Sequence, residues 1–559
     1  MKYISKVKYL CMAAAVAGLT GCGDFGDLNI DPEHPNEGNV PMEIMLTSAM
    51  HQALGSDWDI WRAGLAYTAQ WNQHITNPNW ASYARNSYSD DYASSLWGAV
   101  YSGSRGAVRM VTTCLDKWKG DAQNKDNYEI ARIVRVYIMH RLTDQYGDIP
   151  YFQAGYSDKY SYPVYDKQED IYKDMLAQLD SAQNELGVGT ASIGPKDIYY
   201  QGDLTKWKKF ANSLMLRLAM RLVKVSPELA EKYAAKAYAN GCITETEDNC
   251  KLEHPGGSVD DDSSEPFAKI VSYSDVGKNF INATFYRILK DREDPRIPLI
   301  MCIVDHDYNA QYGTDEYSTG NADPAIQQGL EGFFSYTSGN DYCIIKYPEG
   351  AEFTDSMALE KKKYSLNGND KNYYRYYFSI PNRLTYGDPT APTFICTAAQ
   401  TNLLLAEAAV RGYISGNPND FYKKGMWCAM EQFAAYPNAN SLVNAYLTDD
   451  VINSYVTAHS LDMSKALEEI NTQYYITCFG DEYETWANWR RSGYPELKFR
   501  DMYNSPEEPL NYKGLVRRMT YPSRESQVNK ANYEDALQRQ WGRTTDFTFT
   551  GDRVWWDKE

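Results

Sequence analysis

Apolar residues recur every three or four positions in several stretches of the chain, which is the spacing of a buried stripe along an α-helix. The clearest case follows Asp203, a plausible N-cap, and carries lysines and arginines between apolar residues at Trp207, Phe210, Ala211, Leu214, Leu218 and Leu222. Ser226-Pro227 then opens a second, alanine-rich helix, which Asn240-Gly241 ends. Together the two segments predict a helical hairpin.

Two further hairpins are predicted by the same spacing. One joins a helix with apolar residues over 130–142 to a helix with apolar residues over 171–182, and the other joins the run at 403–409 to a helix from about 421 to 436. Such hairpins are similar to tetratricopeptide units. Their starts, near residues 128, 204 and 399, do not keep a fixed period, so we expect long insertions to interrupt the stack.

The longest interruption lies between residues 242 and 396, which are rich in Gly, Asp, Tyr and Pro and contain only short apolar runs. Loops of this length in a compact domain usually serve function. The segment from 505 onward is also loop-like and ends in Trp555-Trp556, which we expect to pack against the body because exposed paired tryptophans favour aggregation.

This pattern predicts a mainly α fold, in which irregular tetratricopeptide-type hairpins support a large loop-rich region with short strands. The expected scaffold comprises residues 43–241 and 397–500, the loop-rich insertion residues 242–396, and the C-terminal packing segment residues 501–559. We expect residues 22–559 to form a single domain.

The amino terminus has the pattern of a secretory signal, with three lysines, an apolar run from Tyr9 to Leu19, and then Thr20-Gly21-Cys22. The order of residues 19–22 resembles a bacterial lipobox, which predicts a signal peptide of residues 1–21 and lipidation of Cys22. The alternative is an ordinary signal peptide cut elsewhere. Acyl chains on Cys22 would anchor the body without a spanning helix, and no later stretch reaches the 18 or so apolar residues that a span needs. Asp24 and Asp27 resemble the signal that exports some lipoproteins to the outer face of the outer membrane.

Composition narrows the class of ligand. The formal net charge of −18 repels phosphate backbones, so electrostatic binding of nucleic acid is not expected. The chain has 47 tyrosines and 13 tryptophans, and flat, half-polar rings suit contact with sugars, peptides and other proteins. Composition therefore favours a binding protein.

Candidate ligand contacts come from two segments. Trp80 lies in a loop with Asn79, Tyr83 and Arg85, a set that offers aromatic faces for sugar C–H groups and polar partners for hydroxyls. The alternative is that Trp80 anchors the loop by packing. The second segment, residues 373–378, contains Tyr373 and Tyr374; its alternation also fits a strand with half of its rings buried. Helix-like spacing predicts core positions for Trp58, Trp61, Trp71 and Trp97.

The sequence offers little support for an enzyme or for a metal site. The sequence contains no HExxH, GxSxG, Walker or dinucleotide-binding motif, and no CxxC pair. His140 is expected to be structural, while Asp260-Asp261-Asp262 and Asp305-His306-Asp307 are weak candidates for calcium or another metal. Cys242 and Cys250 bracket a polar segment, so a disulfide between them stays open. We expect no cofactor and no catalysis, although carboxylate pairs for glycoside hydrolysis depend on distances that a sequence does not show.

A series of ordered motifs begins at Cys22 and covers nearly the whole mature chain. The motifs are Asp27 to Pro32, Thr143 to Tyr151, Tyr165 to Tyr172, Trp207 to Arg221, Asp294 to Arg296, Leu405 to Ala408, Trp486 to Pro495 and Arg517 to Glu525. In these motifs and their order the chain resembles the SusD/RagB family of outer-membrane nutrient-binding lipoproteins. These motifs look structural rather than ligand-binding.

The resemblance implies a surface-exposed lipoprotein that caps a SusC-like TonB-dependent transporter and delivers a captured ligand as a hinged lid. It also implies ligand contacts in the loop after the first helices. An oligosaccharide is the expected cargo and a peptide the alternative; a surface glycoside hydrolase and a scaffold lipoprotein are the alternatives from other classes.

Overall fold

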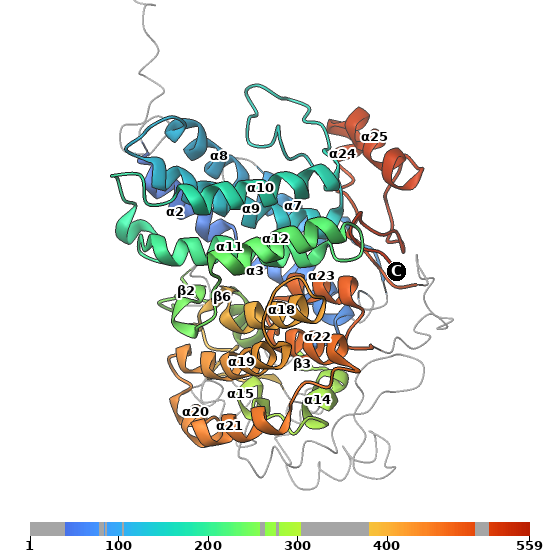
Figure 1. Cartoon of the computed structure of the whole chain (residues 1–559). Coiled ribbons are helices and arrows are strands. Elements are labelled where there is room, and N and C mark those ends of the chain that lie inside the picture. The colour runs from blue at the N-terminus through green and yellow to red at the C-terminus, as the bar shows by residue number, and fades with distance from the viewer. Residues whose placement is uncertain are drawn as a thin grey trace, which may run out of the picture.

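The computed structural model describes residues 40–77, 83, 86–102, 106–257, 263–274, 279–302, 380–497 and 514–559. Helices dominate these residues and form two stacked groups, one coloured blue to green and the other yellow to orange in Figure 1. The predicted mainly α fold is confirmed.

The first group is a series of helices, each in contact with the next (Figure 1). In order along the series they are α2 (Met42–Gln52), α8 (Ala107–Trp118), α9 (Lys125–Tyr146), α10 (Gln168–Glu185), α11 (Leu204–Arg221) and α12 (Pro227–Asn240). Two of the predicted hairpins, α9 with α10 and α11 with α12, lie in this group. Short 3₁₀ turns at Gly194–Lys196 (η4) and Thr246–Asp248 (η5) flank α11 and α12.

The second group is built around α18 (Ala398–Val410), which packs on α19, on α22 and on α11 of the first group. It also contains α19 (Pro418–Glu431), the 3₁₀ turn η11 (Gln432–Ala435), α20 (Asn440–Tyr446), α21 (Asp449–Ala458), α22 (Ala466–Thr477) and α23 (Glu482–Ser492). The third predicted hairpin is α18 with α19. Because α23 also contacts α9, the two groups share one core.

Local sequence explains where α11 and α12 begin and end. The Asp203 carboxylate accepts hydrogen bonds from the backbone N–H groups of Thr205 and Lys206, at 2.9 and 3.1 Å, which satisfies donors that the first turn leaves free. Pro227 occupies the first turn of α12, and Gly241 ends that helix at a φ of +92°. Trp207 is fully buried and donates its indole N–H to Asp197.

Three short antiparallel sheets join segments that lie far apart in the chain. β1 (Ile75–Thr76) pairs with β3 (Phe280–Ile281), β2 (Cys250–Leu252) with β6 (Thr393–Cys396), and β4 (Met301–Cys302) with β5 (Ile380–Pro381). The described part of the insertion also forms α13 (Pro266–Lys269), the π-turn η6 (Ile270–Ser274), α14 (Ala283–Lys290) and α15 (Ile297–Ile300). The β1–β3 sheet therefore joins the insertion to the segment between α2 and α8, whereas the other two sheets join parts of the insertion to one another.

Between α2 and α8 the chain forms a compact group of short elements. It contains α3 (Asp57–Asp59), a π-helical turn η1 (Ile60–Thr68), α4 (Ala69–Trp71), α6 (Asp90–Ala93) and α7 (Ser95–Tyr101). The π-helical turn contacts α23, so this group rests on the second set of helices.

The C-terminal segment differs from its predicted loop-like character, because residues 525–541 form α24 (Glu525–Val528) and α25 (Lys530–Trp541). The signal was a short stripe, Tyr533, Ala536 and Leu537, followed by Gly542 in the left-handed conformation. The expected packing against the body is confirmed: Trp556 is fully buried and its indole Nε1 donates to the Asp144 carboxylate at 3.0 Å. Of the helices in the described ranges, none is long and apolar enough to cross a bilayer.

Candidate functional site

Of the predicted ligand contacts, the structure describes Tyr83. Asn79, Trp80 and Arg85 in the first segment, and Tyr373 and Tyr374 in the second, lie outside the described residues. The same holds for Cys22 and for both metal candidates, Asp260-Asp261-Asp262 and Asp305-His306-Asp307. The candidate site is therefore described starting from the surroundings of Tyr83.

Tyr83 is half-buried and packs between two other tyrosines, with a T-shaped contact to Tyr67 and a tilted one to Tyr92. Its ring centroid lies 5.4 Å from that of Tyr67 and 4.9 Å from that of Tyr92. Tyr67 is fully buried; its hydroxyl donates to the Ser87 carbonyl at 2.9 Å and accepts from the Ser89 N–H at 3.0 Å. Burial raises the pKa of Tyr67 well above its ordinary value, so this hydroxyl stays protonated and keeps donating. Tyr67 thus fixes the backbone just beyond Tyr83.

The contacts continue from Tyr92 to two tryptophans on α3 and η1. The ring centroid of Trp61 lies 5.4 Å from that of Tyr92 and 5.3 Å from that of Trp58. We call this set, Trp58, Trp61, Tyr92 and Tyr83, the aromatic row. It connects the one described residue of the predicted loop site to an exposed end at Trp58.

The structure corrects one of the four predicted core tryptophans. Trp71 and Trp97 are buried and Trp61 is half-buried, but Trp58 is 56% exposed. The signal that was missed is the capping box, in which Ser56 and Asp59 exchange backbone and side-chain hydrogen bonds. It places Trp58 in the first turn of a helix, where one flank faces solvent.

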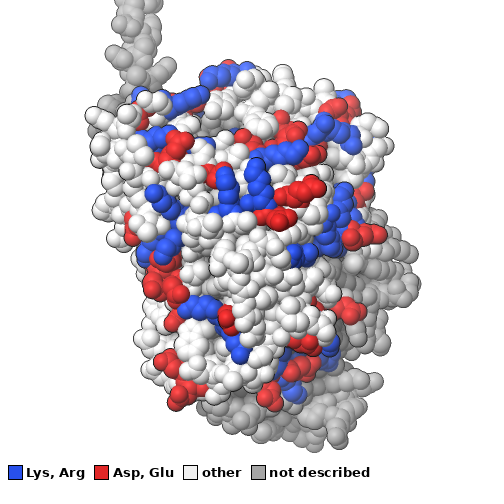
Figure 2. All heavy atoms as spheres, viewed as in Figure 1, with Lys and Arg blue, Asp and Glu red and all other residues white. Residues whose placement is uncertain are grey.

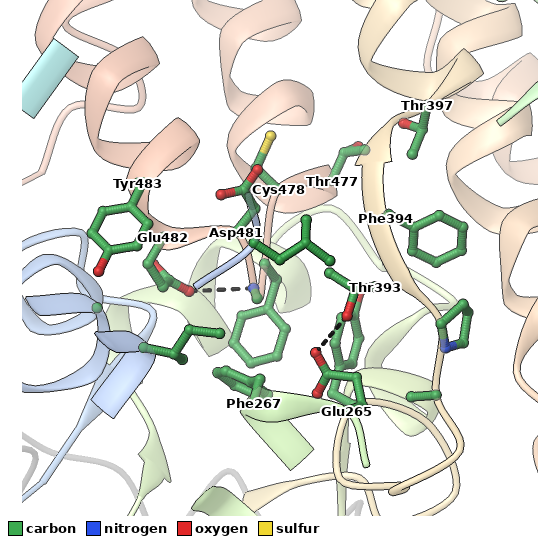
Figure 3. Close-up of a pocket in the computed structure, with 18 of the residues that line it drawn as sticks. Glu265, Phe267, Thr393, Phe394, Thr397, Thr477, Cys478, Asp481, Glu482 and Tyr483 are labelled. Carbon is green, nitrogen blue, oxygen red and sulfur yellow. Dashed lines mark hydrogen bonds between the residues drawn. The ribbon is translucent and has the colours of Figure 1, made fainter. Parts of the chain in front are cut away.

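Beside η1 the structure has a partly open cavity of about 80 Å³ (Figure 3). Its walls come from η1, α13, the strand β6, and the turn between α22 and α23, and include Phe267, Phe394, Cys478 and Tyr483. Ligand pockets for small molecules measure roughly 300–1,000 Å³, whereas a water takes about 30 Å³. The cavity is therefore sized for a few waters and not for a sugar ring.

Glu265 is the notable carboxyl group of this cavity. It accepts a hydrogen bond from the Thr393 hydroxyl at 3.0 Å, drawn in Figure 3, and one from the Ala268 N–H at 2.6 Å. Burial raises its pKa to about 7, and the two hydrogen bonds moderate that rise. Because Glu265 caps α13 and has no second described carboxylate in hydrogen-bond contact, we assign it a structural role.

A second hollow of about 450 Å³ opens beside the C-terminal residues Trp541 and Trp555. Two of the four cations that line it are paired, Arg539 with Asp148 at 2.8 Å and Arg553 with Asp557 at 2.8 Å; the other two are Lys167 and Lys558. The Trp541 indole N–H donates to the Arg553 carbonyl. This hollow has the volume of a ligand pocket.

Among the described residues, the one cluster with metal-ligand character is His140, Asp144 and Glu484, all buried. Arg221 occupies the centre of this cluster, 2.6 Å from Glu484 and 3.4 Å from Asp144. Burial, together with the nearby arginines, lowers the pKa of His140 to about 3, so it is neutral. The cluster is an internal ion-pair network, and His140 has the structural position expected for it.

Cys242 and Cys250 are free, buried thiols, as are the other cysteines of the described ranges. Cys250 pairs across the sheet with Cys396 and not with Cys242. The structure therefore decides against the disulfide that the sequence left open.

Charge on the visible face of the molecule alternates in sign (Figure 2). Among the ion pairs of α10 to α12 and η5, Lys236 pairs with Asp180, and Lys209 lies 2.6 Å from Asp248. Interleaved signs do not create the positive field that attracts a nucleic acid.

Comparisons with known proteins extend these observations to the whole chain. No curated protein matches it. Two solved structures are similar in sequence and fold: a chitin-binding protein, 28% identical with a TM-score of 0.72, and a SusD-like protein from Bacteroidetes AC2a, 26% identical with a TM-score of 0.77, each covering 93% of this chain and 100% of its own. A SusD-like protein from Bacteroides thetaiotaomicron shares the fold at 22% identity and a TM-score of 0.64, covering 93% of this chain and 99% of its own.

The SusD-like family profile, described as "Starch-binding associating with outer membrane", matches residues 36–522. That range includes both helical groups and the aromatic row. The chain belongs to this SusD-like family of nutrient-binding proteins that associate with the outer membrane.

Proposed function

We propose that the protein captures an oligosaccharide at the cell surface and passes it to a SusC-like TonB-dependent transporter, as a hinged lid and without catalysis. The observation that carries this proposal is the family match over residues 36–522. The two packed helical groups supply a scaffold for such a lid.

The cargo class follows from chemistry and from the names of relatives. The family description names starch and one similar structure is named for chitin, and both are uncharged polysaccharides. Aromatic faces suit the C–H groups of such sugars, and we keep Asn79, Trp80, Tyr83, Arg85, Tyr373 and Tyr374 as proposed contacts. Peptide cargo is the alternative within the same role. No cofactor is required.

Attachment to the outer membrane is proposed to depend on Cys22 and its acyl chains. Cys22→Ala is expected to release the protein from the membrane fraction into the soluble fraction. Its persistence in outer membranes at the wild-type level would contradict the lipoprotein proposal.

Affinity electrophoresis tests the function directly. The mature protein, in non-ionic detergent, is run through gels that contain soluble starch, a soluble chitin derivative, or one of several other neutral and acidic polysaccharides. Retardation by a neutral glycan, weakened in Trp80→Ala and unchanged in the exposed-loop control Tyr162→Ala, supports the proposal. Retardation by none of them moves the assignment to peptide cargo.

The same samples test for catalysis. Incubation of the retarding glycan with the protein alone, followed by chromatography of the products, is expected to return the glycan intact. Shorter products would favour a surface glycoside hydrolase.

A further inference from the structure

One loop of the molecule gathers exposed apolar side chains. Residues 151–165, which we call the α9–α10 loop, project in teal between α8 and α24 at the top of Figure 1. Four of its large apolar side chains are between 40% and 69% exposed, namely Phe152, Tyr160, Tyr162 and Val164. Single exposed apolar residues are common, but several on one loop mark an interaction site.

Hydrogen bonds hold the backbone of this loop. At its start, the Asp166 carboxylate accepts from the N–H groups of Tyr151 and Phe152, both at 2.9 Å. Near its end, the side chain of Asn532 on α25 donates to the Tyr162 carbonyl at 3.0 Å. The rings are therefore presented on a fixed backbone, and little conformational freedom is lost when a partner covers them.

The α9–α10 loop lies beside the first turn of α2. The Tyr156 hydroxyl of the loop donates to the Asp116 carboxylate of α8 at 3.2 Å, and Lys159 pairs with the same carboxylate at 3.9 Å. Two residues earlier on α8, the Cys114 thiol donates to the carbonyl of Met42, the first residue of α2, at 3.4 Å. The loop and the start of α2 thus contact the same turn of one helix.

This position matters because α2 follows the proposed lipid anchor. Residues 22–39 separate Cys22 from the start of the described chain, and a segment of that length spans at most about 60 Å. Acyl chains on Cys22 would therefore hold the start of α2, and the α9–α10 loop next to it, within that distance of the bilayer.

The chemistry of the loop suits a lipid surface. A tyrosine has an apolar ring and a polar hydroxyl, which fit the boundary between acyl chains and headgroups. The loop carries one acid, Asp158, and one base, Lys159, so it does not add to the repulsion between an anionic membrane and a chain of net charge −18.

We propose that the α9–α10 loop is a second, non-covalent contact with the membrane that holds the anchor. Phe152, Tyr160 and Tyr162 enter the headgroup region, while the loop backbone stays outside it. This inference rests on the lipidation of Cys22 in the proposed function. An acyl anchor alone leaves the body free to turn about its tether, whereas a second contact fixes which face is directed towards the bilayer.

Fluorescence quenching in vesicles tests the contact. The mature lipidated protein is inserted into phosphatidylcholine vesicles that contain some phosphatidylglycerol, with an environment-sensitive fluorophore attached through Tyr162→Cys. Every sample also carries Cys343→Ser, because Cys343 lies outside the described residues, whereas the cysteines of the described ranges are buried. Lipids with a nitroxide on the headgroup or upper acyl chain are expected to quench the label about twofold or more.

The matched control places the same label through Met463→Cys. Met463 is 60% exposed but lies between α21 and α22 in the second helical group, so its label is expected to be quenched little. In the protein labelled at position 162, Phe152→Ser with Tyr160→Ser is expected to halve the quenching or more. Raising salt from about 0.05 to about 0.5 M is expected to leave the wild-type quenching unchanged, since apolar burial and not charge makes the contact.

Equal quenching at positions 162 and 463 would overturn the membrane contact, and quenching that survives the double serine variant would overturn its assignment to the apolar side chains. A label at position 162 that lipids do not quench, but that a co-inserted SusC-like transporter shields, would assign the loop to the transporter instead. The gels that test glycan binding contain detergent and no bilayer. Failure of the membrane contact is therefore distinguishable from failure of the proposed function, which would show as absence of retardation by every glycan.

Discussion

Two places in the molecule carry the same local sequence, Trp-x-x-Trp-Arg, and the fold uses them in opposite ways. Trp58 to Arg62 lies on α3 and η1, and Trp486 to Arg490 lies on α23. In both, the arginine lies over the first tryptophan, at 5.2 Å for Arg62 and 3.8 Å for Arg490. Trp58 is nevertheless 56% exposed, whereas Trp486 is fully buried.

The difference comes from what covers each arginine. The guanidinium of Arg490 donates to the carbonyls of Asp144 and Arg517, at 2.7 and 2.8 Å, and also lies over the ring of Trp556. These partners come from α9 and from the C-terminal segment. Arg62 has Asp91 from α6 as its partner, and that carboxylate faces solvent. The same motif therefore forms core where distant segments close over it and leaves an open aromatic face where none does.

The largest expected effect is on the buried motif. Trp486→Ala removes a fully buried indole that packs against Trp71 and under Arg490, and is expected to lower the free energy of unfolding by about 3–5 kcal/mol. Urea unfolding followed by circular dichroism measures it. A loss below about 1 kcal/mol would mean that the two motifs do not differ as described.

The next largest effect on the free energy of unfolding is expected at the ion pair between Arg491 and Glu407, beside the buried motif. Arg491 donates to both oxygens of Glu407, at 2.7 and 2.8 Å. Burial alone raises the pKa of Glu407, but the charge of Arg491 and its hydrogen bonds outweigh burial and lower the pKa to about 2. Glu407→Gln leaves Arg491 buried without its counter-charge and is expected to cost about 3 kcal/mol at neutral pH.

The sign of the pH dependence checks this assignment. A carboxyl group with a lowered pKa in the folded state stabilises the protein above its ordinary pKa and stops doing so as pH falls towards about 2. The wild type is therefore expected to lose stability from about pH 4.5 downwards, and Glu407→Gln to lose less over the same range. Equal losses in both proteins would assign the acid sensitivity to other carboxylates.

Glu265, which lines the cavity beside η1, provides the opposite case. Its pKa is raised to about 7 by burial, so the folded protein holds a proton that the unfolded chain has released. Stability from this group is present below about pH 4.5 and falls as pH rises towards 7. Glu265→Gln imitates the protonated acid. Compared with the wild type, the variant is therefore expected to gain on the order of 2 kcal/mol in free energy of unfolding between pH 4 and pH 8. A difference between wild type and variant that does not change with pH would contradict this.

The smallest expected effect is on the exposed motif. Trp58→Ala removes a side chain that is more than half in water, so the free energy of unfolding is expected to change by less than about 1 kcal/mol. The same urea experiment as for Trp486→Ala measures it. A loss comparable with that of Trp486→Ala would show that Trp58 is part of the core.

Much of the scaffold followed from local sequence. The stripes of α9 to α12, α18 and α19 have the helical period, and the caps at Asp203, Pro227 and Gly241 act within a few residues of the helix ends that they fix. Helix α25 escaped prediction because its stripe is short and its flanks contain prolines and charges. Of the candidate site, Tyr83 could be named from its loop. Its packing partners Tyr67 and Tyr92 lie on separate elements, and no sequence signal linked them to Tyr83.

The sequence by itself determined the helices, their pairing into hairpins, the acidic aromatic-rich character of the chain and the family to which its ordered motifs pointed. Tertiary structure alone decided which of two identical Trp-x-x-Trp-Arg motifs is core and which is surface, and that Cys250 faces Cys396 rather than Cys242. The physical reason is range. Capping and periodicity act within a turn or two of helix, whereas exposure depends on segments far away in the chain, such as Asp144 and Trp556, which cover the motif at Trp486.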